Sequence, residues 1–300
     1  MIIVIAGGSG FIGTQLSKKL IDLGHTVVIV DIYPPSFSNK ELFFINCDIT
    51  KQSLPYNILE KTDAVINLVG KPINSKWTEK NKTEIKNSRV NSTRHIVESI
   101  ISTSIKPSCF ICASAIGYYG DTNGHIADET TSKGKGFLSD LVQDWENQAM
   151  VAEKEGVRVV CVRTAPVLGS SGGLLKQLKR TAGLGFLLRL KKEDFWMSWI
   201  HEEDIVNTYL FALETKTVQG VFNASSPEPV THKYFMKSLS VFLHRRVVGY
   251  LPRFISKRVF GELFDEITKS QQVVPNRLLD KGFVFKYPTL SSTFDQLFKK

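Results

Sequence analysis

The glycine-rich segment Gly7–Gly13 is the feature that most restricts what this chain can fold into. It follows the apolar, β-branched run Ile2–Ala6 and leads directly into Phe11–Leu23, where apolar residues recur at helical spacing. A strand, a glycine turn and a helix N-terminus in this order form a cradle for the phosphates of a dinucleotide. The segment therefore predicts an α/β fold that begins with a dinucleotide-binding strand-turn-helix unit.

The three spaced glycines of this loop have different tasks. Gly7 permits the tight turn, Gly10 lets the backbone approach the diphosphate, and Gly13 lets the helix pack closely on the strand. Because the loop lies between a strand and a helix and a second strand follows, the pattern is more specific than three glycines alone. The other candidate cofactor contacts in the loop are Ser9, Phe11 and Ile12.

The second predicted strand, Thr26–Val30, is followed at once by Asp31. A carboxylate at this position accepts hydrogen bonds from the adenosine ribose hydroxyls and repels a 2′-phosphate. Asp31 therefore favours NAD over NADP. The alternative is an aspartate that only forms the turn before Pro34 and Pro35.

Two further strand ends carry candidate cofactor contacts, because ligands bind at the carboxyl ends of the strands in such a sheet. Asp48 and Ile49 follow the third strand and are placed at the adenine edge. The fourth strand ends in a segment that would pass beneath the nicotinamide ribose, or would be a plain strand-end turn: Asn67, Leu68, Val69 and Gly70, followed by Lys71.

In the first half of the chain, short β-branched runs alternate with amphipathic stretches, and this pattern predicts a Rossmann-type doubly wound parallel sheet. The remainder predicts a smaller, mainly helical C-terminal lobe. The strands are expected near Ile2–Ala6, Thr26–Val30, Leu42–Asn46, Ala64–Leu68, Ser108–Ala113 and Arg158–Arg163, with helices over Phe11–Leu23, Thr83–Thr103 and Phe137–Glu155. We assign 1–169 and about 196–225 to the NAD(P)-binding domain, the latter adding edge structure to the sheet. The segment 196–225 thus returns to the first domain and begins with a strand over Trp196–Ile200. The substrate lobe consists of 170–195 and 226–300.

Composition excludes several classes of protein. The chain is 42% hydrophobic and 22% charged, and charges interrupt every apolar run before it reaches the roughly 18 residues of a membrane-spanning helix. Its N-terminus lacks the basic segment and cleavage site of a secretory signal. We therefore expect a cytoplasmic protein with no membrane partner.

The four cysteines and the net charge of +9 add little chemistry. Cys109 and Cys112 form a C-x-x-C, but strand alternation would point their thiols to opposite faces, which argues against a redox or metal site.

The positive charge suits an anionic partner, yet the basic residues are scattered and no zinc-finger spacing is present. We therefore do not favour a nucleic-acid partner, and we predict no metal site.

Long strings of residues resemble the extended short-chain dehydrogenase/reductase superfamily, and within it the "epimerase family protein" group with its own C-terminal domain, some members of which have been labelled cell-division inhibitors. The strings are GGSGFIG (Gly7–Gly13), NLVGKPI (Asn67–Ile73), SRVNSTR (Ser88–Arg94), CASAIGYYG (Cys112–Gly120), VRTAPVLG (Val162–Gly169), WMSWIHEED (Trp196–Asp204) and NASSPEPVT (Asn223–Thr231). The resemblance covers essentially the whole chain.

This resemblance implies a Rossmann sheet with a nicotinamide dinucleotide and a nominal oxidoreductase or sugar-epimerase activity. The group is associated with NADPH and often has a basic residue after the second strand, where this chain has Asp31. It also often has an acidic residue after the fourth strand, where this chain has Lys71. Superfamily members often dimerise through the helices equivalent to 83–103 and 137–155. By analogy, Leu141 and Trp145 would supply a hydrophobic patch for a homodimer.

Catalysis in the superfamily uses a serine or threonine after the fifth strand and a Tyr-x-x-x-Lys on the next helix. Ser114 suits the first role; the alternative is a strand-end serine that bonds its own backbone. The helix GFLSDLVQDWE contains no Tyr-x-x-x-Lys. If Glu146 is aligned with the acidic residue that often follows the lysine, Leu138 and Val142 occupy the tyrosine and lysine positions, and neither transfers a proton.

Other side chains are candidates to complete the site. Tyr118 and Tyr119 are the nearest phenols that can replace the missing acid/base, or they only pack on the cofactor or between lobes. Arg163 would hold a substrate anion or would pair with an acidic side chain. The remaining candidates near the substrate are Lys76, Trp77, Arg89, Trp199 and His201, the last with a bonded structural role as its alternative.

We therefore predict an NAD(P)-dependent oxidoreductase or nucleotide-sugar-epimerase-like protein that acts on an undefined small polar substrate, any anionic substituent of which the cationic side chains would hold. Its rival is a non-catalytic dinucleotide-binding redox sensor that regulates a partner, which the missing Tyr-x-x-x-Lys favours. Nucleic-acid binding through the basic lobe is a third and weaker hypothesis.

Overall fold

The computed structural model describes all residues except 75, 183–184, 192 and 300. Its centre is a seven-stranded sheet in the order β12-β7-β5-β4-β1-β2-β3, and every neighbouring pair is parallel. The strands are β1 (Ile2–Ala6), β2 (Thr26–Asp31), β3 (Leu42–Asn46), β4 (Ala64–Asn67), β5 (Cys109–Ala115), β7 (Arg158–Thr164) and β12 (Gly220–Ala224). The predicted Rossmann sheet is confirmed, with boundaries that differ by at most two residues.

The order of the strands reverses beside β1. The chain builds β1, β2 and β3 outward in one direction and then returns to place β4 on the other side of β1. Such a switch point opens a crevice at the carboxyl ends of the strands, because the connections leave in opposite directions. The glycine loop between β1 and α1 (Phe11–Asp22) lies at this point.

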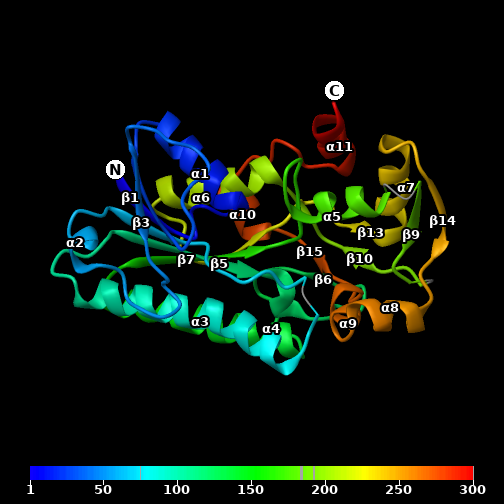
Figure 1. The fold of residues 1–300 in the computed structure, drawn as a ribbon, viewed down its shortest axis with the longest axis horizontal. Coiled ribbons are helices and arrows are strands. Elements are labelled where there is room, and N and C mark those ends of the chain that lie inside the picture. Colours follow the sequence, from blue (N-terminus) through cyan, green and yellow to red (C-terminus); the bar gives the residue numbers. More distant parts are fainter. Residues whose placement is uncertain (75, 183–184, 192, 300) are drawn as a thin grey trace.

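Helices cover both faces of the sheet (Figure 1). On one face α1 and α6 (Glu202–Glu214) pack together over a core that includes Leu16 and Tyr209. On the other face α3 (Glu79–Ser102) and α4 (Phe137–Met150) bury Ile96 and Trp145. The connections contain α2 (Tyr56–Leu59), η1 (Ile116–Tyr119), β6 (Ile126–Ala127) and η2 (Val151–Glu155).

Helix α3 begins four residues before the expected start. The side-chain oxygen of Thr78 accepts a hydrogen bond from the Asn81 backbone N–H and so caps the helix. Capping supplies a partner for a first-turn N–H, which the hydrophobic periodicity of the sequence does not register.

The chain after β7 forms short strands and mainly short helices. They are β8 (Val167–Leu168), α5 (Gly173–Ala182), β9 (Phe186–Arg189), β10 (Trp196–Met197), β11 (Ile200–His201), β13 (Val230–Thr231), α7 (His232–Phe242), β14 (Arg246–Tyr250), α8 (Arg253–Phe260), α9 (Leu263–Ile267), β15 (Gln272–Val273), α10 (Asn276–Asp280) and α11 (Leu290–Phe298). Four two-stranded sheets join β10 to β13, β11 to β8, β14 to β9 and β15 to β6. A separate core forms here around Trp199, Phe235 and Phe294.

The expected strand over Trp196–Ile200 is divided in two. Strand β10 pairs antiparallel with β13, whereas β11 pairs parallel with β8. Between them Ser198 donates its hydroxyl hydrogen toward the carbonyls of Gln271 and Val273. Strand β12 does extend the edge of the main sheet beside β7, as expected for 196–225. The assignment of two domains itself stays a prediction.

The proposed dimer patch is wrong as an exposed surface. Leu141 is 3% and Trp145 4% exposed, because both side chains pack within this chain. The indole N–H of Trp145 donates to Thr93 Oγ1 at 2.9 Å. A dimer through α3 and α4 stays a prediction without this patch.

The cysteines are buried and free, and Cys109 and Cys112 belong to cores on opposite faces of the sheet as predicted. Burial raises the pKa of Cys109 to about 11 and that of Cys112 to about 12, which keeps both as thiols. Among the described residues, no helix combines the length and apolar character needed to cross a membrane.

Candidate functional site

The glycine loop packs against itself and against the end of β4. Gly7 has a φ of +78°, and a Cβ added there would lie 2.9 Å from the Leu68 carbonyl carbon and the Val69 nitrogen. A Cβ at Gly13 would lie 2.7 Å from the Gly7 oxygen. Both positions therefore require glycine, as the sequence predicted from the strand-turn-helix pattern.

The N-terminus of α1 is suited to an anion. No side chain caps the helix at Gly10, and its first turn contains no acidic residue. A Cβ at Gly10 would meet only the Gly7 oxygen, at 3.2 Å, so the space in front of this exposed backbone is open. Uncapped N–H groups and the positive end of the helix dipole fit a diphosphate at this position.

Side chains of the loop have structural contacts of their own. Ser9 Oγ donates to the Tyr33 carbonyl at 2.7 Å. The Phe11 ring lies against the glycines after β8, since a Cβ at Gly172 would be 2.3 Å from it. Ile12 packs on the core. Phe11 and Ile12 would therefore contact a cofactor through their backbone N–H groups.

Asp31 forms the turn that was the alternative to its role at the ribose, and it also bonds the glycine loop. Its Oδ1 accepts from the backbone N–H groups of Ile32 and Tyr33, at 2.7 and 3.3 Å, and so forms the turn. Its Oδ2 accepts from the Ser9 backbone N–H at 3.1 Å, which joins the carboxylate to the glycine loop. The carboxylate is half-buried, and its contact with an adenosine ribose stays a prediction.

The side chains that follow β3 are occupied by contacts within the protein. Asp48 accepts from the Thr50 N–H and hydroxyl and pairs with Lys51 at 2.8 Å. The Ile49 side chain is 3% exposed, and its carbonyl bonds the His95 ring. The adenine contacts proposed for this segment stay predictions, with its backbone as the available part.

The end of β4 is a braced turn with an exposed Gly70. Asn67 is fully buried; its Nδ2 donates to Thr93 Oγ1 at 2.9 Å and its Oδ1 accepts from the Val69 N–H at 3.1 Å. Leu68 is half-buried beside it. The bonds hold the loop open beside the switch point, where a dinucleotide would cross the sheet.

Two cations follow this turn, and they differ in their partners. The Lys71 ammonium pairs with Glu84, and its backbone N–H donates to Ser88 Oγ at 2.9 Å. Arg89 Nη1 donates to the carbonyls of Lys71 and Ile85, at 2.9 and 3.1 Å. Within the described part of the chain, no carboxylate pairs with Arg89.

The position of Arg89 suits a ligand anion. A Cβ at Gly70 would lie 3.0 Å from its Cζ, so the guanidinium lies directly against the exposed turn after β4. Burial lowers the pKa of Arg89 to about 10, which still leaves it charged at neutral pH. Lys76, the other candidate cation near this turn, is exposed, and it forms no ion pair with the residues that the structure describes.

Ser114 and Arg163 belong to a buried network rather than to an open cleft, and their expected roles are corrected accordingly. Ser114 Oγ donates to Glu146 Oε1 at 2.5 Å. Arg163 Nε and Nη2 donate to the two oxygens of Glu146 at 2.8 and 2.7 Å. All three side chains are less than a tenth exposed. The alternation of β5 turns Ser114 toward α4, on the same face as Cys112.

The pairing of Glu146 is not predicted by the sequence pattern, which leaves the acidic partner of Arg163 unspecified. Glu146 on α4 is that partner. Burial lowers the pKa of Arg163, but its hydrogen bonds and charge interaction with Glu146 outweigh burial and raise that pKa above its ordinary value. The Arg163 guanidinium therefore binds a carboxylate of the protein itself rather than a substrate anion.

Tyr119 is not available as an acid/base in this structure. It is 3% exposed; its hydroxyl donates to Asn223 Oδ1 at 2.7 Å and accepts from Arg163 Nη1 at 3.0 Å. Burial raises its pKa to about 12. Tyr118 is half-buried, and the Arg163 guanidinium lies 3.4 Å from its ring centre. Of the two phenols, Tyr118 alone stays a candidate.

An apolar cluster surrounds Leu138 and Val142, the residues that an alignment on Glu146 gives the positions of the usual tyrosine and lysine. Val142 is 1% exposed and packs with Leu141, Ile85 and Leu263, while Leu138 is partly buried against the same cluster. Trp77, expected to line a cleft, is also 6% exposed here and stands edge-on to the Phe137 ring. Its indole N–H donates to the Ile73 carbonyl. Proton transfer from these positions is therefore excluded by side-chain chemistry.

Trp199 and His201 do not line a cleft either. Trp199 is fully buried in the C-terminal core. His201 is 1% exposed: its Nδ1 accepts from the Glu203 N–H and caps α6, and its Nε2 lies 3.0 Å from Gln296 Oε1. Burial lowers the pKa of His201, which favours the neutral ring that capping needs. The structural alternative for His201 is the one observed.

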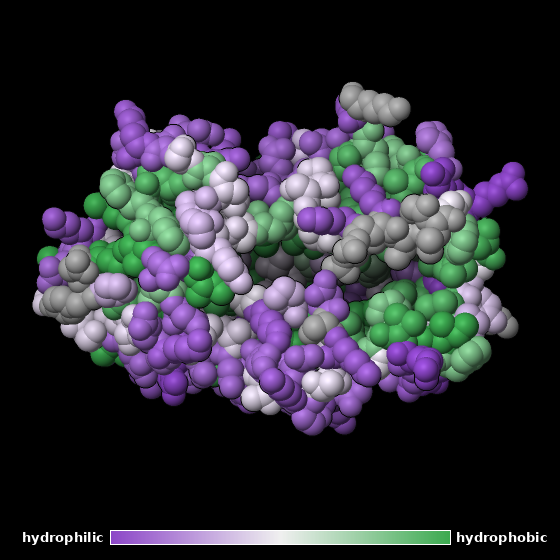
Figure 2. Space-filling model, in the orientation of Figure 1, coloured by the Kyte–Doolittle hydropathy of each residue, from purple (hydrophilic) through white to green (hydrophobic). Residues whose placement is uncertain are grey.

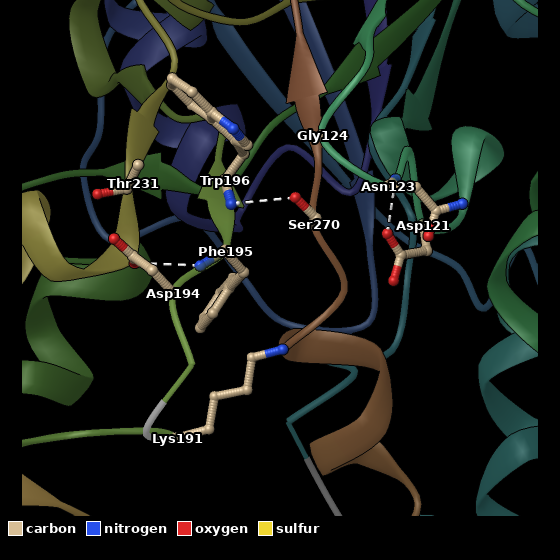
Figure 3. Close-up of a pocket in the computed structure, with 9 residues that line it drawn as sticks. All are labelled: Asp121, Asn123, Gly124, Lys191, Asp194, Phe195, Trp196, Thr231 and Ser270. Carbon is tan, nitrogen blue, oxygen red and sulfur yellow. Dashed lines mark hydrogen bonds between the residues drawn. The ribbon is translucent and has the colours of Figure 1, made fainter.

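A pocket of about 380 Å³ opens elsewhere, beside β10 (Figure 3). Its lining residues are Asp121, Asn123, Gly124, Lys191, Asp194, Phe195, Trp196, Thr231 and Ser270. Lys191 donates to the Thr268 carbonyl at 3.0 Å, and Asp194 accepts from the Phe195 and Lys233 N–H groups. No residue of the glycine loop lines this pocket, so it is separate from the candidate dinucleotide site.

Next to this pocket, His232 should make stability depend on pH. Its ring stacks on Phe195 with 4.6 Å between centres, and burial lowers its pKa from 6.5 to about 4. Protonation of the unfolded chain below pH 6.5 therefore favours unfolding. We expect the free energy of unfolding, measured in urea, to fall by roughly 3 kcal/mol between pH 6.5 and 4 through this group. His232→Phe keeps the stacking and should remove that part of the dependence; an unchanged profile would contradict the assignment.

Comparison with known proteins agrees with this geometry. Residues 3–225 match the NAD dependent epimerase/dehydratase family, and residues 251–297 match a domain of unknown function (DUF1731). The chain is 32% identical to the epimerase family protein YfhF of Bacillus subtilis, over 99% of this chain and 98% of that protein. It is also 32% identical to the chloroplastic SDR39U1 homolog of Arabidopsis thaliana, over 96% and 84% of the two chains.

Solved structures show the same architecture. The human epimerase family protein SDR39U1, crystallised with NADPH, superimposes with a TM-score of 0.87 at 28% identity, over 99% of both chains. UDP-glucose 4-epimerase of Thermotoga maritima has a TM-score of 0.79 at 18% identity, over 99% of this chain and 97% of that one, and shares the fold. From its sequence match and its extended Rossmann architecture, this chain belongs to the NAD dependent epimerase/dehydratase family.

Proposed function

We propose that this protein binds a nicotinamide dinucleotide across the carboxyl ends of β2, β1 and β4. The observation that carries the proposal is the uncapped N-terminus of α1, which presents open space at Gly10 beside a loop that only glycine can form. The backbone of Gly10–Gly13 would hold the diphosphate, and Asp31 would hold the adenosine ribose. When bound, the nicotinamide ring supplies hydride exchange.

The bound form is NAD(H) rather than NADP(H) in this proposal. Asp31 places a carboxylate beside Ser9, where a 2′-phosphate would meet a like charge. The human relative crystallised with NADPH supports binding of a nicotinamide dinucleotide, whereas the preference proposed for NAD(H) rests on Asp31. The competing forms can be separated by direct titration.

Calorimetric titration of dinucleotide-free protein with NAD⁺, NADH, NADP⁺ and NADPH tests the proposal. Wild type should bind NADH more tightly than NADPH. Asp31→Ser should weaken NADH binding by about 10-fold to 100-fold, since hydrogen bonds to a charged group are lost, and should relax discrimination against NADPH. Asp22→Ser, which makes the same charge change at an exposed residue at the end of α1, is the matched control and should change neither. Tighter NADPH binding by wild type would overturn the preference, and binding of no form would overturn the proposed function.

The reaction proposed first is that of an oxidoreductase or epimerase-like enzyme on a small polar, anionic substrate. Arg89 supports the anionic substituent, because its guanidinium borders Gly70 and lacks a carboxylate partner among the described residues. Tyr118 is the phenol left for acid/base work. Turnover of NADH with a sugar nucleotide or a related anionic substrate, lost in Tyr118→Phe with NADH affinity unchanged, would support this reaction.

A second candidate, a non-catalytic sensor of nicotinamide redox state, is favoured by a specific observation. Helix α4 contains no Tyr-x-x-x-Lys, its residues Leu138 and Val142 lie in an apolar cluster, and Ser114 is bound to Glu146. A sensor needs different affinities for the oxidised and reduced dinucleotide and no turnover. The same titrations report that difference directly.

A further inference from the structure

The segment of β14 and α8 has an unusual charge. Between Leu243 and Gly261 the chain contains five arginine or lysine residues and no aspartate or glutamate. The segment forms the outer edge of one end of the molecule's long axis (Figure 1). Its helix α8 lies within residues 251–297, which match the domain of unknown function.

Apolar side chains on this segment are exposed. Phe254 is 75%, Val259 59% and Ile255 37% exposed on α8. At about 100° per residue, the three fall within a sector of roughly 140° on the helix. Ser256, behind them, is fully buried and donates its hydroxyl hydrogen toward nearby carbonyls, including that of Leu251. The polar residue thus faces the protein and the apolar residues face outward.

Strand β14 continues this arrangement. Its residues alternate in exposure, so that Val248 (60%) and Tyr250 (43%) share one face with Arg246 while Val247 is half-buried. Figure 2 shows hydrophobic residues gathered at the end of the molecule where Figure 1 places β14 and α8, with hydrophilic residues beside them. We call the five exposed apolar residues the β14–α8 surface: Val248, Tyr250, Phe254, Ile255 and Val259.

Arginine and lysine side chains lie on the same segment as this surface, and acidic side chains neutralise only some of them. Arg253 and Lys257 share one carboxylate, Asp265, at 3.6 and 3.2 Å. Arg246 and Arg258 are exposed, and in the described ranges neither forms an ion pair with an acidic side chain. Arg258 falls within the same helical sector as Phe254 and Val259.

We propose that the β14–α8 surface docks this protein reversibly on a bilayer that contains anionic phospholipid. Aromatic and β-branched side chains that project among arginines can enter the boundary between headgroups and acyl chains, while the cations stay at the anionic headgroups. The predicted absence of a membrane partner rested on the lack of a spanning segment, and that criterion does not address surface docking. The proposal is independent of the dinucleotide site.

The charge of the surface favours lipid over a second copy of this chain. Two such surfaces placed face to face would bring like charges together around the apolar residues. A bilayer offers many anionic groups and a deformable apolar layer at once, so it complements both features of the surface.

Vesicle co-sedimentation of the full chain tests the proposal. Vesicles of phosphatidylcholine alone should bind little protein, and vesicles with about a quarter phosphatidylglycerol should bind it in a salt-sensitive manner. Phe254→Ser with Val259→Ser should lower the partition coefficient at least about tenfold, and so should Arg246→Glu with Arg258→Glu. The first variant tests insertion of apolar side chains into the bilayer, and the second tests electrostatic attraction of the arginines to anionic headgroups.

Matched variants control for overall charge and hydrophobicity. Lys154→Glu with Lys216→Glu makes the same charge change at exposed residues on other elements, and Val284→Ser removes an apolar side chain that is 83% exposed elsewhere. Both should bind like wild type, and circular dichroism should show that every variant folds. No binding to anionic vesicles, or binding that survives the β14–α8 variants, would overturn the proposal. A wild-type dimer in light scattering that Phe254→Ser with Val259→Ser converts to a monomer would assign the surface to self-association instead.

Discussion

Arg163→Met is expected to lower the free energy of unfolding by about 3–5 kcal/mol. The substitution leaves Glu146 buried, 9% exposed by its side chain, without the two guanidinium bonds of 2.7 and 2.8 Å. A buried charge without its partner keeps the full cost of leaving water. Urea denaturation followed by circular dichroism measures the change, and the melting temperature should fall by roughly 10 °C.

Two variants control this experiment. Lys86→Met breaks an ion pair with Asp144 between α3 and α4 in which both side chains are nearly half exposed, and should cost about 1 kcal/mol or less. Glu146→Leu combined with Arg163→Met removes both charges and should recover part of the loss, because no unpaired charge stays buried. If Arg163→Met costs no more than Lys86→Met, the buried pair is not the stabilising element that its geometry indicates.

Gly10→Val is expected to reduce dinucleotide affinity at least about 100-fold while the protein stays folded. The φ of Gly10 is −72°, which any residue adopts, and an added Cβ meets only the Gly7 oxygen. The valine side chain would instead take the space in front of α1 that the diphosphate needs. Calorimetry with NADH gives the affinity, and the melting temperature reports the fold.

Gly13→Ala provides the contrast. Its methyl group would lie 2.7 Å from the Gly7 oxygen and from Gly8 backbone atoms, so this variant should lose stability as well as affinity. Wild-type affinity in Gly10→Val would show that the diphosphate does not lie at the N-terminus of α1. Loss of folding in Gly10→Val but not in Gly13→Ala would reverse the roles assigned to the two glycines.

The sequence was sufficient where the determining interactions are local. The run Ile2–Ala6, the glycines that follow it and the helical periodicity of α1 lie within one short stretch, and each has one favourable arrangement. The same holds for the alternation that sends Cys109 and Cys112 to opposite faces of β5. The fold class, the strand positions of the main sheet and the shape of the glycine loop therefore followed from the residues alone, whereas the division of the expected strand Trp196–Ile200 did not.

The chemistry of the candidate active site depended on contacts between distant residues. Ser114 meets Glu146 across 32 positions of sequence, and Tyr119 meets Asn223 across 104. Which atoms face each other is decided by how α4 lies over β5 and β7 and by the insertion of β12 at the sheet edge. Sequence periodicity specifies which face of an element is buried but not its partner there. The sequence by itself thus determined the Rossmann fold, and only the tertiary structure decided that Ser114 and Arg163 bond Glu146 in a buried network, because Glu146 lies on another element, far from both along the chain.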